Sequence, residues 1–580
     1  MNIDYIKNDN KDLFLQFKNE NLSNFTEIQN YIPVYKEFFN LTNKNYKNVN
    51  FKLNNNLKSL VDKVSENKFL CEIENSEKKD IIKKNVYLKF AHLIDPIKYM
   101  LGKYKDVDEE KFFRLPIINE NSEIENSENN YLDKYNLIHN SSYIDGLFSF
   151  ISSKTKEDNF IHANDFYGMF LGIQKNYKID VSDDLEYLFQ SEYFHNKKNI
   201  LFSLESNDNI YLDKSYKYKK PLQIINDNTN LEIDEFPNEL LNTIFISPLN
   251  NNELDVTIDV SNNKIKENII YENLNNNNTS RKTDDSGSTC SSSSSKTENN
   301  NSEGGSEEED SDEGSDEGSD EDSDEGSEEE LNSYGIINKY PTLVIATECC
   351  EITLDEYMNT SEINNNEWKS ILFQIIVILI KYQKLFDFTH NDLHNCNVVF
   401  ELTEREYLYY KIDNVNYKVP SYGKVYKIID FGRAIFKINE KRFCSDCFNK
   451  GEDADSQYNC EPFITKEKPI IEPNNSFDLC RFGCSMYDYF IDDIDEEDEV
   501  CKKNPIANLI RKWCLDDNEK NILYKKTGEE RYPEFKLYKM IARNVHHHIP
   551  IKEIKNKLFE KFITNSKSMK NIKKNKIKII

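Results

Sequence analysis

Three polar side chains in the second half of the sequence are of the types that phosphoryl transfer requires. Asp392 and Asn397 stand five positions apart between two apolar runs, within F-T-H-N-D-L-H-N-C-N-V-V-F at residues 388–400. Thirty-three residues after Asn397, the segment I-I-D-F-G carries Asp430. Phosphoryl transfer needs a carboxylate that positions the attacking hydroxyl, and it needs oxygen ligands for magnesium. We therefore expect Asp392 to orient a hydroxyl, and Asn397 and Asp430 to bind Mg²⁺.

The order of these segments resembles the protein-kinase superfamily, in which a catalytic loop H-x-D-L-x-x-x-N is followed by D-F-G. A third segment, S-F-D-L-C-R-F-G-C at residues 476–484, is similar to the D-x-W-S-x-G-C helix of that family. The resemblance implies that Asp478 is a buried acid that braces the backbone of the catalytic loop. A polar turn and a chance tripeptide are the alternative for the first two segments, and the correct order of all three favours the kinase-like interpretation.

Residues 388–484 as a whole resemble the protein-kinase-like proteins of large DNA viruses of the mimivirus type. His394 departs from ordinary Ser/Thr kinases, which carry a lysine two positions after the catalytic acid; haspin-like and small-molecule kinases also have histidine there. A neutral histidine can still donate a hydrogen bond to the transferring phosphate. The resemblance implies an ATP- and Mg²⁺-dependent kinase that acts on Ser or Thr of a protein substrate, with a small-molecule kinase as one alternative.

A lysine and an acid in the first third of the sequence are candidates for holding the ATP phosphates. The segment V-Y-L-K-F at residues 86–90 alternates like a half-buried strand and resembles the family's V-A-I-K strand, which makes Lys89 the candidate lysine. Residues 140–153 have helical spacing and begin at N-cap residues, and their acid is Asp145. Kinases generally place a glutamate there, so Asp145 is either the partner of Lys89 or an acid favoured by the helix dipole.

The segment that should cover the nucleotide lacks glycine. Residues 57–74 predict two strands about a turn at residues 65–68, where a kinase has its glycine-rich loop, and no glycine precedes Gly102. Such loops use glycine so that backbone N–H groups can approach the phosphates. This departure motivates a second alternative, a catalytically weak or inactive kinase-like scaffold.

Two further residues are expected beside the adenine. Residues 340–347 predict a buried strand, and the following E-C-C-E has the position of a kinase hinge, which makes Glu348 and Cys350 candidates for the nucleotide site. A strong helical pattern at residues 365–384 leads directly into the catalytic loop.

These assignments predict an α+β protein with a bilobal kinase-like fold. We expect a small β-rich N-lobe with one main helix, a larger and mainly helical C-lobe, and a long disordered acidic insertion. The expected boundaries are an N-terminal extension (1–55), the N-lobe (56–348, interrupted at about 207–335), the C-lobe (349–562) and a basic tail (563–580).

The net charge of −28 is concentrated in one tract. Residues 303–330 contain 17 acidic residues and no basic ones, and they follow runs of Asn and Ser. Such a composition cannot bury enough apolar surface to offset chain entropy, so we expect disorder from about residue 275 to 330. The tract is either a solubilising linker or a segment that binds basic protein partners.

The remaining composition indicates the compartment. The twelve cysteines show no disulfide framework, and residues 1–10 are polar, unlike a signal peptide. The longest apolar run, residues 371–380, is too short to span a bilayer. These features predict an intracellular protein without membrane insertion or nucleic-acid binding. The viral resemblance implies the cytoplasm or nucleus of a host cell, or association with the virion.

Overall fold

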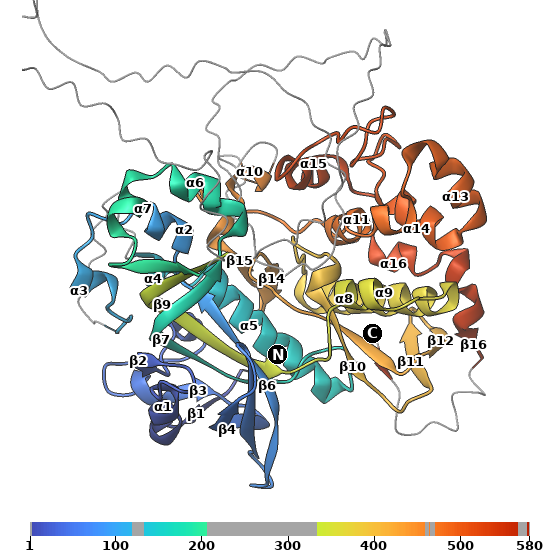
Figure 1. Ribbon diagram of the computed structural model, residues 1–580. Coiled ribbons are helices and arrows are strands. Elements are labelled where there is room, and N and C mark those ends of the chain that lie inside the picture. Colours follow the sequence, from blue (N-terminus) through green and yellow to red (C-terminus); the bar gives the residue numbers. More distant parts are fainter. Residues whose placement is uncertain are drawn as a thin grey trace, which may run out of the picture. The chain divides into compact units, whose positions relative to one another are not determined.

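The chain is a mixed α/β protein with a curled antiparallel sheet (Figure 1). The expected acidic tract lies outside the part that the structure describes, so its disorder stays a prediction. The computed structural model describes residues 3–118, 133–205, 333–458, 463–464, 470–565 and 577–578.

A seven-stranded antiparallel sheet is built mainly from the first half of the chain. Its order is β2-β7-β9-β6-β5-β4, and β8 pairs with β9. The central strand β9 is apolar and buried from Tyr340 to Ala346 because it has neighbours on both sides. The bounds are β2 (Phe25–Gln29), β4 (Asn55–Lys63), β5 (Lys68–Asn75), β6 (Ile81–His92), β7 (Phe166–Asp180), β8 (Phe202–Glu205) and β9 (Tyr334–Glu348).

The sheet register matters for the candidate site. In the β6–β9 pair Lys89 lies opposite Ile345, so the candidate lysine is in the middle of the sheet. In the β8–β9 pair Glu205 lies opposite Tyr334. The two ends of the segment that joins β8 to β9 therefore face each other across a single hydrogen-bonded ladder.

Part of the N-terminal stretch is built into this sheet. We expected a helical or irregular extension, but β2 pairs with β7 along one edge. Helix α1 (Lys11–Phe17) buries Leu13 and Phe17 against the same sheet, while β1 (Tyr5–Lys7) pairs with β3 (Val49–Phe51). Although this stretch is rich in Asn and Lys, its aromatic side chains are buried and contribute to the core, which the composition did not predict.

Helix α5 (Ser141–Lys154) confirms the helix that was predicted at residues 140–153. Asn140 is its N-cap, with a side chain that accepts a hydrogen bond from the Ser142 N–H. The helix packs against β7 and β9 (Figure 1). Gly146 allows this close approach, because a Cβ at that position would lie only 2.8 Å from Met169 Sδ. The approach places the neighbouring Asp145 beside the sheet.

Helix α9 (Asn365–Phe386) is the core of the second half, and the predicted helix is confirmed. Its apolar residues from Ile371 to Ile380 are almost entirely buried. No helix within the described part of the chain is long and apolar enough to cross a membrane. The other α-helices of this half are α8 (Leu354–Thr360), α10 (Asp455–Tyr458), α11 (Phe477–Cys484), α12 (Tyr487–Phe490), α13 (Glu497–Lys503), α14 (Pro505–Trp513), α15 (Lys536–Asn544) and α16 (Pro550–Glu553).

Short antiparallel pairs surround the site segments. Strands β11 and β12 form a hairpin with its turn at Asp413 and Asn414, both at positive φ. The tail contributes two short strands that pair with this hairpin. The bounds are β10 (Val398–Leu402), β11 (Tyr407–Ile412), β12 (Val415–Pro420), β13 (Lys424–Ile428), β14 (Ile435–Ile438), β15 (Lys441–Cys444), β16 (Ile563–Thr564) and β17 (Ile577–Lys578).

A buried histidine predicts how the fold responds to acid. His162 is fully buried, with Nδ1 2.7 Å from the Tyr426 carbonyl oxygen and Nε2 2.9 Å from the Tyr410 hydroxyl. Burial lowers the pKa of His162 to about 4, from 6.5. Between these pH values the unfolded chain binds a proton that the folded chain does not, so the free energy of unfolding falls as the pH falls. We expect a loss of about 3 kcal/mol by pH 4 from this residue.

Urea unfolding of the wild type and of His162→Gln at pH 7, 6, 5 and 4.5 measures the contribution of His162 to the free energy of unfolding. The difference between the two proteins should change with pH, because other titrating groups are common to both. A difference that stays constant across the range would contradict the assignment.

Candidate active site

The catalytic loop begins where α9 ends, and a buried acid holds its backbone. Asp387 closes the helix in the left-handed region, at φ 50°. Asp478 on α11 accepts hydrogen bonds from the His390 N–H at 2.9 Å and the Asn391 N–H at 3.0 Å. The bracing role predicted for Asp478 is thus confirmed by geometry. Burial raises the pKa of Asp478 to about 6, against the lowering effect of His390 and of these backbone N–H groups.

The side chain of His390 joins the catalytic loop to the segment that carries Asp430. His390 Nε2 lies 2.9 Å from the Ile429 carbonyl oxygen, and Nδ1 accepts the Asp392 N–H at 3.3 Å. The Ile429 N–H in turn donates to the Asn397 carbonyl oxygen at 3.0 Å. Both ends of the catalytic loop are therefore hydrogen-bonded to the residue that precedes Asp430.

Asn391 and Asp430 both adopt left-handed backbone conformations, with φ of 67° and 64°. Non-glycine residues reach this region at a cost of roughly 1–2 kcal/mol, and such residues gather at functional sites. The Asn391 side chain is held by two contacts, from Nδ2 to the Arg433 carbonyl oxygen at 2.9 Å and from the Tyr458 hydroxyl to Oδ1 at 2.7 Å. The surrounding structure therefore fixes the conformation next to Asp392.

Asp392 lies among cationic and hydroxyl groups. Its Oδ1 accepts a hydrogen bond from the Tyr538 hydroxyl at 2.7 Å, and its Oδ2 is 3.6 Å from Arg433 Nη1. Burial alone would raise the pKa of Asp392, but Arg433, His394 and Arg481 outweigh it and hold the pKa below its usual value. Asp392 is therefore an anion at neutral pH, as a hydroxyl-orienting group should be.

Asn397 keeps its amide oxygen available. Its Nδ2 donates to the Asp392 carbonyl oxygen at 2.9 Å and lies 3.0 Å from His394 Nε2. Both bonds use the NH₂ group, so they leave Oδ1 as a ligand atom for a hard cation. Burial lowers the pKa of His394 to about 4, despite the opposing effect of Asp392. His394 is therefore neutral at pH 7 and can accept the Asn397 amide proton.

Lys89 joins the sheet, helix α5 and the Asp430 segment. Its Nζ lies 2.7 Å from Asp145 Oδ2 and 2.8 Å from Asp430 Oδ1. Asp145 Oδ1 also accepts the Phe431 N–H at 3.0 Å. Burial would lower the pKa of Lys89, but the two carboxylates raise it above its usual value. The expected ion pair between Lys89 and Asp145 is present, so the aspartate side chain reaches the lysine although it is shorter than glutamate.

Asp430 has an environment that suits a divalent cation. Burial would raise its pKa, but Lys89 lowers it, so the carboxylate is ionised at neutral pH. The side chain is 43% exposed, which leaves room for further ligands. No cluster of three or more His, Cys, Asp or Glu side chains within the described residues is arranged to hold a metal. Magnesium that is bound through one or two protein oxygens, phosphates and water does not require such a cluster.

The side chains of Glu348 and Cys350 have other partners. Glu348 Oε2 lies 2.7 Å from Lys427 Nζ and 3.4 Å from Lys156 Nζ. Cys350 Sγ lies 3.4 Å from Asn164 Oδ1, and burial raises the pKa of its thiol to about 12. An ion-paired carboxylate and a protonated thiol leave only the backbone of this segment for contact with an adenine.

The turn between β4 and β5 lies at residues 64–67, within one residue of its predicted position. The Val64 N–H and the Ser65 N–H both donate to the Lys68 carbonyl oxygen, at 2.9 and 3.0 Å. These two donors are therefore used within the turn and do not point freely toward a phosphate. The turn is closed by ordinary backbone bonds where a glycine-rich loop would expose its N–H groups.

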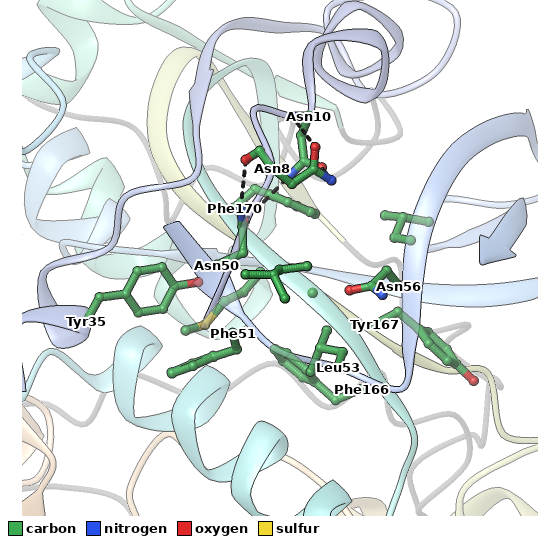
Figure 2. Close-up of a pocket in the computed structure, with 14 residues that line it drawn as sticks. Asn8, Asn10, Tyr35, Asn50, Phe51, Leu53, Asn56, Phe166, Tyr167 and Phe170 are labelled. Atoms are coloured by element: carbon green, nitrogen blue, oxygen red, sulfur yellow. Dashed lines mark hydrogen bonds between the residues drawn. The ribbon is translucent and has the colours of Figure 1, made fainter. Parts of the chain in front are cut away.

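A pocket elsewhere in the sheet region contains none of the predicted site residues (Figure 2). It is lined by amides and aromatic rings, and the Asn50 amide donates to the Asn8 carbonyl oxygen at 2.9 Å. Its lining residues include Asn8, Asn10, Tyr35, Asn50, Phe51, Phe166, Tyr167 and Phe170. The pocket lacks the convergent acids and lysine that distinguish the catalytic-loop region.

Sequence reasoning did not find Arg433, Arg481 and Tyr538, which act on Asp392, or Phe535, which stacks on Tyr538. Tyr538 and Phe535 come from the end of the chain and belong to no motif. Arg481 is inside the S-F-D-L-C-R-F-G-C segment, and its guanidinium lies 4.9 Å from the centre of the Tyr538 ring. Arg481 could have been found from the sequence, because it is a basic residue in the same segment as Asp478.

Comparison with curated proteins finds one similarity of note. A probable serine/threonine-protein kinase of Dictyostelium discoideum is 38% identical to this chain over 94 residues. The match covers 15% of this chain and 8% of that protein. No protein-family model matches the chain. Together with the site geometry, this short similarity supports a kinase-like relationship.

Proposed function

We propose that this chain is an ATP- and Mg²⁺-dependent phosphotransferase that transfers a phosphoryl group to a protein hydroxyl, most simply on Ser or Thr. The observation that carries the proposal is the pair of contacts from Lys89 to Asp145 and Asp430, at 2.7 and 2.8 Å. These three residues are far apart in the sequence and come from a strand, a helix and the segment after β13. A lysine between two such acids is the arrangement that protein kinases use for ATP phosphates and magnesium.

The other residues have complementary roles in this proposal. Asp392 is ionised and orients the acceptor hydroxyl. Asn397 Oδ1 and the Asp430 carboxylate hold Mg²⁺, which, when bound, offsets the charge of the phosphates. His394, neutral at pH 7, donates or accepts a hydrogen bond near the transferring group. A bilobal kinase-like arrangement of the sheet and the helical half is part of the proposal.

Replacing Asp430 with asparagine tests the metal role. We expect Asp430→Asn to weaken Mg²⁺-dependent ATP binding by at least about tenfold, because a neutral amide attracts the cation less than a carboxylate does. ATP binding without Mg²⁺ should change much less. Isothermal titration of the full chain with ATP, with and without Mg²⁺, measures both quantities.

Asp413→Asn is a matched control. Asp413 lies at the β11–β12 turn, pairs with Lys384 at 3.0 Å and is 46% exposed. The same chemical change there should leave ATP binding unaltered. Equal Mg²⁺ dependence in the wild type and Asp430→Asn would reject the metal assignment.

One observation favours a second candidate function, a kinase-like protein that does not turn over ATP. The β4–β5 turn uses its Val64 and Ser65 N–H groups internally. These two N–H groups are then not available to contact the phosphates of a nucleotide. Magnesium-dependent transfer of labelled phosphate from ATP by the purified chain would eliminate this candidate.

A further inference from the structure

Helix α15 places a hydroxyl group directly on the proposed catalytic carboxylate. The Tyr538 hydroxyl donates to Asp392 Oδ1 at 2.7 Å. Burial raises the pKa of Tyr538, so its hydroxyl keeps the proton that it donates. A phosphotransferase uses that carboxylate to hold the hydroxyl of its acceptor.

The Tyr538 ring packs against an aromatic ring and two arginine side chains. It stacks on Phe535, with ring centres 4.9 Å apart and an angle of 12° between the planes. The guanidinium groups of Arg433 and Arg481 lie 5.6 and 4.9 Å from the ring centre. Among the described residues, the buried Arg481 Nε has no hydrogen-bond partner. Aromatic stacking and two cation–π contacts therefore hold the ring where its hydroxyl meets Asp392.

The cationic groups around Asp392 also suit the Tyr538 side chain. Arg433 and Arg481 both act on Asp392, and His394 is neutral at pH 7. The Arg433 guanidinium lies 3.6 Å from the Asp392 carboxylate, and both guanidinium groups lie over the Tyr538 ring. The Tyr538 side chain fits these charges, because its ring face attracts the cations and its hydroxyl donates to the carboxylate.

We propose that Asp392, Arg433, Arg481 and Phe535 form the acceptor-binding site, and that Tyr538 occupies it as an internal substitute for the hydroxyl side chain of a substrate peptide. This inference rests on the proposed phosphotransfer function and identifies where its acceptor binds. An incoming peptide has to displace Tyr538 from Asp392 before its own hydroxyl can be oriented. Helix α15 therefore competes with the substrate for the same carboxylate.

Transfer kinetics on the full chain test this competition. Tyr538→Phe removes only the hydroxyl, and Tyr538→Ala also removes the ring. With ATP and a mixed pool of Ser-, Thr- and Tyr-containing peptides, both variants should show a KM for peptide about tenfold lower than the wild type, since a hydrogen bond to a charged group is lost from the competing state. The KM for ATP should not change.

Tyr532→Phe is the control, because Tyr532 lies four residues before α15 and its ring has a cation–π contact with Lys536. It should behave as the wild type. An unchanged or higher KM for peptide in both Tyr538 variants would overturn the proposal. Phosphorylation of Tyr538 itself in the wild type would support it, because a hydroxyl that accepts phosphate lies at the acceptor position.

Hydrogen exchange gives a readout that does not depend on turnover. The backbone amides of α15 should exchange about tenfold faster in Tyr538→Phe and in Asp392→Ala than in Tyr532→Phe. Equal exchange in all three would overturn the contact between α15 and Asp392. Absence of phosphate transfer by the wild type and by both Tyr538 variants would instead reject the proposed phosphotransferase function.

Discussion

Replacing Asp392 with asparagine is expected to slow phosphate transfer from ATP by at least about a hundredfold, the usual range for loss of a catalytic acid–base group. Asparagine keeps an oxygen that can accept the Tyr538 hydroxyl, so the local contacts should survive. It removes the negative charge that would orient and deprotonate an acceptor. The rate of labelled phosphate transfer under single-turnover conditions measures this effect.

The control for this change is Glu404→Gln, which alters an exposed acid between β10 and β11. We expect it to keep the wild-type rate. ATP binding in Asp392→Asn should also stay near that of the wild type, because Asp392 is assigned to the acceptor and not to the nucleotide. Equal transfer rates in the wild type and Asp392→Asn would remove Asp392 from the mechanism.

Replacing Lys89 with methionine is expected to lower both activity and stability. The change leaves Asp145, whose side chain is 5% exposed, without its cation. Breaking a buried ion pair by removing one partner typically costs 3–5 kcal/mol, so the free energy of unfolding should fall by about that amount. Phosphate transfer should fall by orders of magnitude because the lysine that holds the ATP phosphates is lost.

A second substitution separates the two effects. In Lys89→Met/Asp145→Asn the buried charge is removed, while the asparagine oxygen can still accept the Phe431 N–H. Stability should recover by a large part of the loss, but transfer should not. Lys83→Met on the same strand is the control, since Lys83 is 59% exposed. Recovery of activity in the double variant would show that Lys89 has only a structural role.

Much of the candidate site could be predicted because its residues come with local patterns. Lys89 stands in an alternating strand, Asp145 follows an N-cap in a helix, and Asp478 stands in a helix with a characteristic sequence. Short-range periodicity determines on which element each residue lies. The kinase resemblance then supplied which of these elements should meet, and the Lys89 contacts agree with that expectation.

Other features depend on long-range packing that leaves little local signal. Strand β7 continues without interruption through Gly168, where a break in the strand would otherwise be expected. Gly168 has φ 147° at the point where the register with β9 shifts, so the glycine accommodates a bulge and the strand continues. Tyr538 reaches Asp392 across 146 positions of the sequence, and no periodicity could indicate such a contact.

The facing positions of Glu205 and Tyr334 have a consequence for how this gene can change. Two strand ends that lie opposite each other can be joined by a short hairpin loop. The entropic cost of closing a longer loop between them grows only slowly with the length of the loop. The sheet therefore tolerates expansion or contraction of the intervening codons without any shift of β8 or β9. Insertions or deletions between residues 205 and 334 are therefore expected to leave the candidate site, whose residues lie on either side, intact.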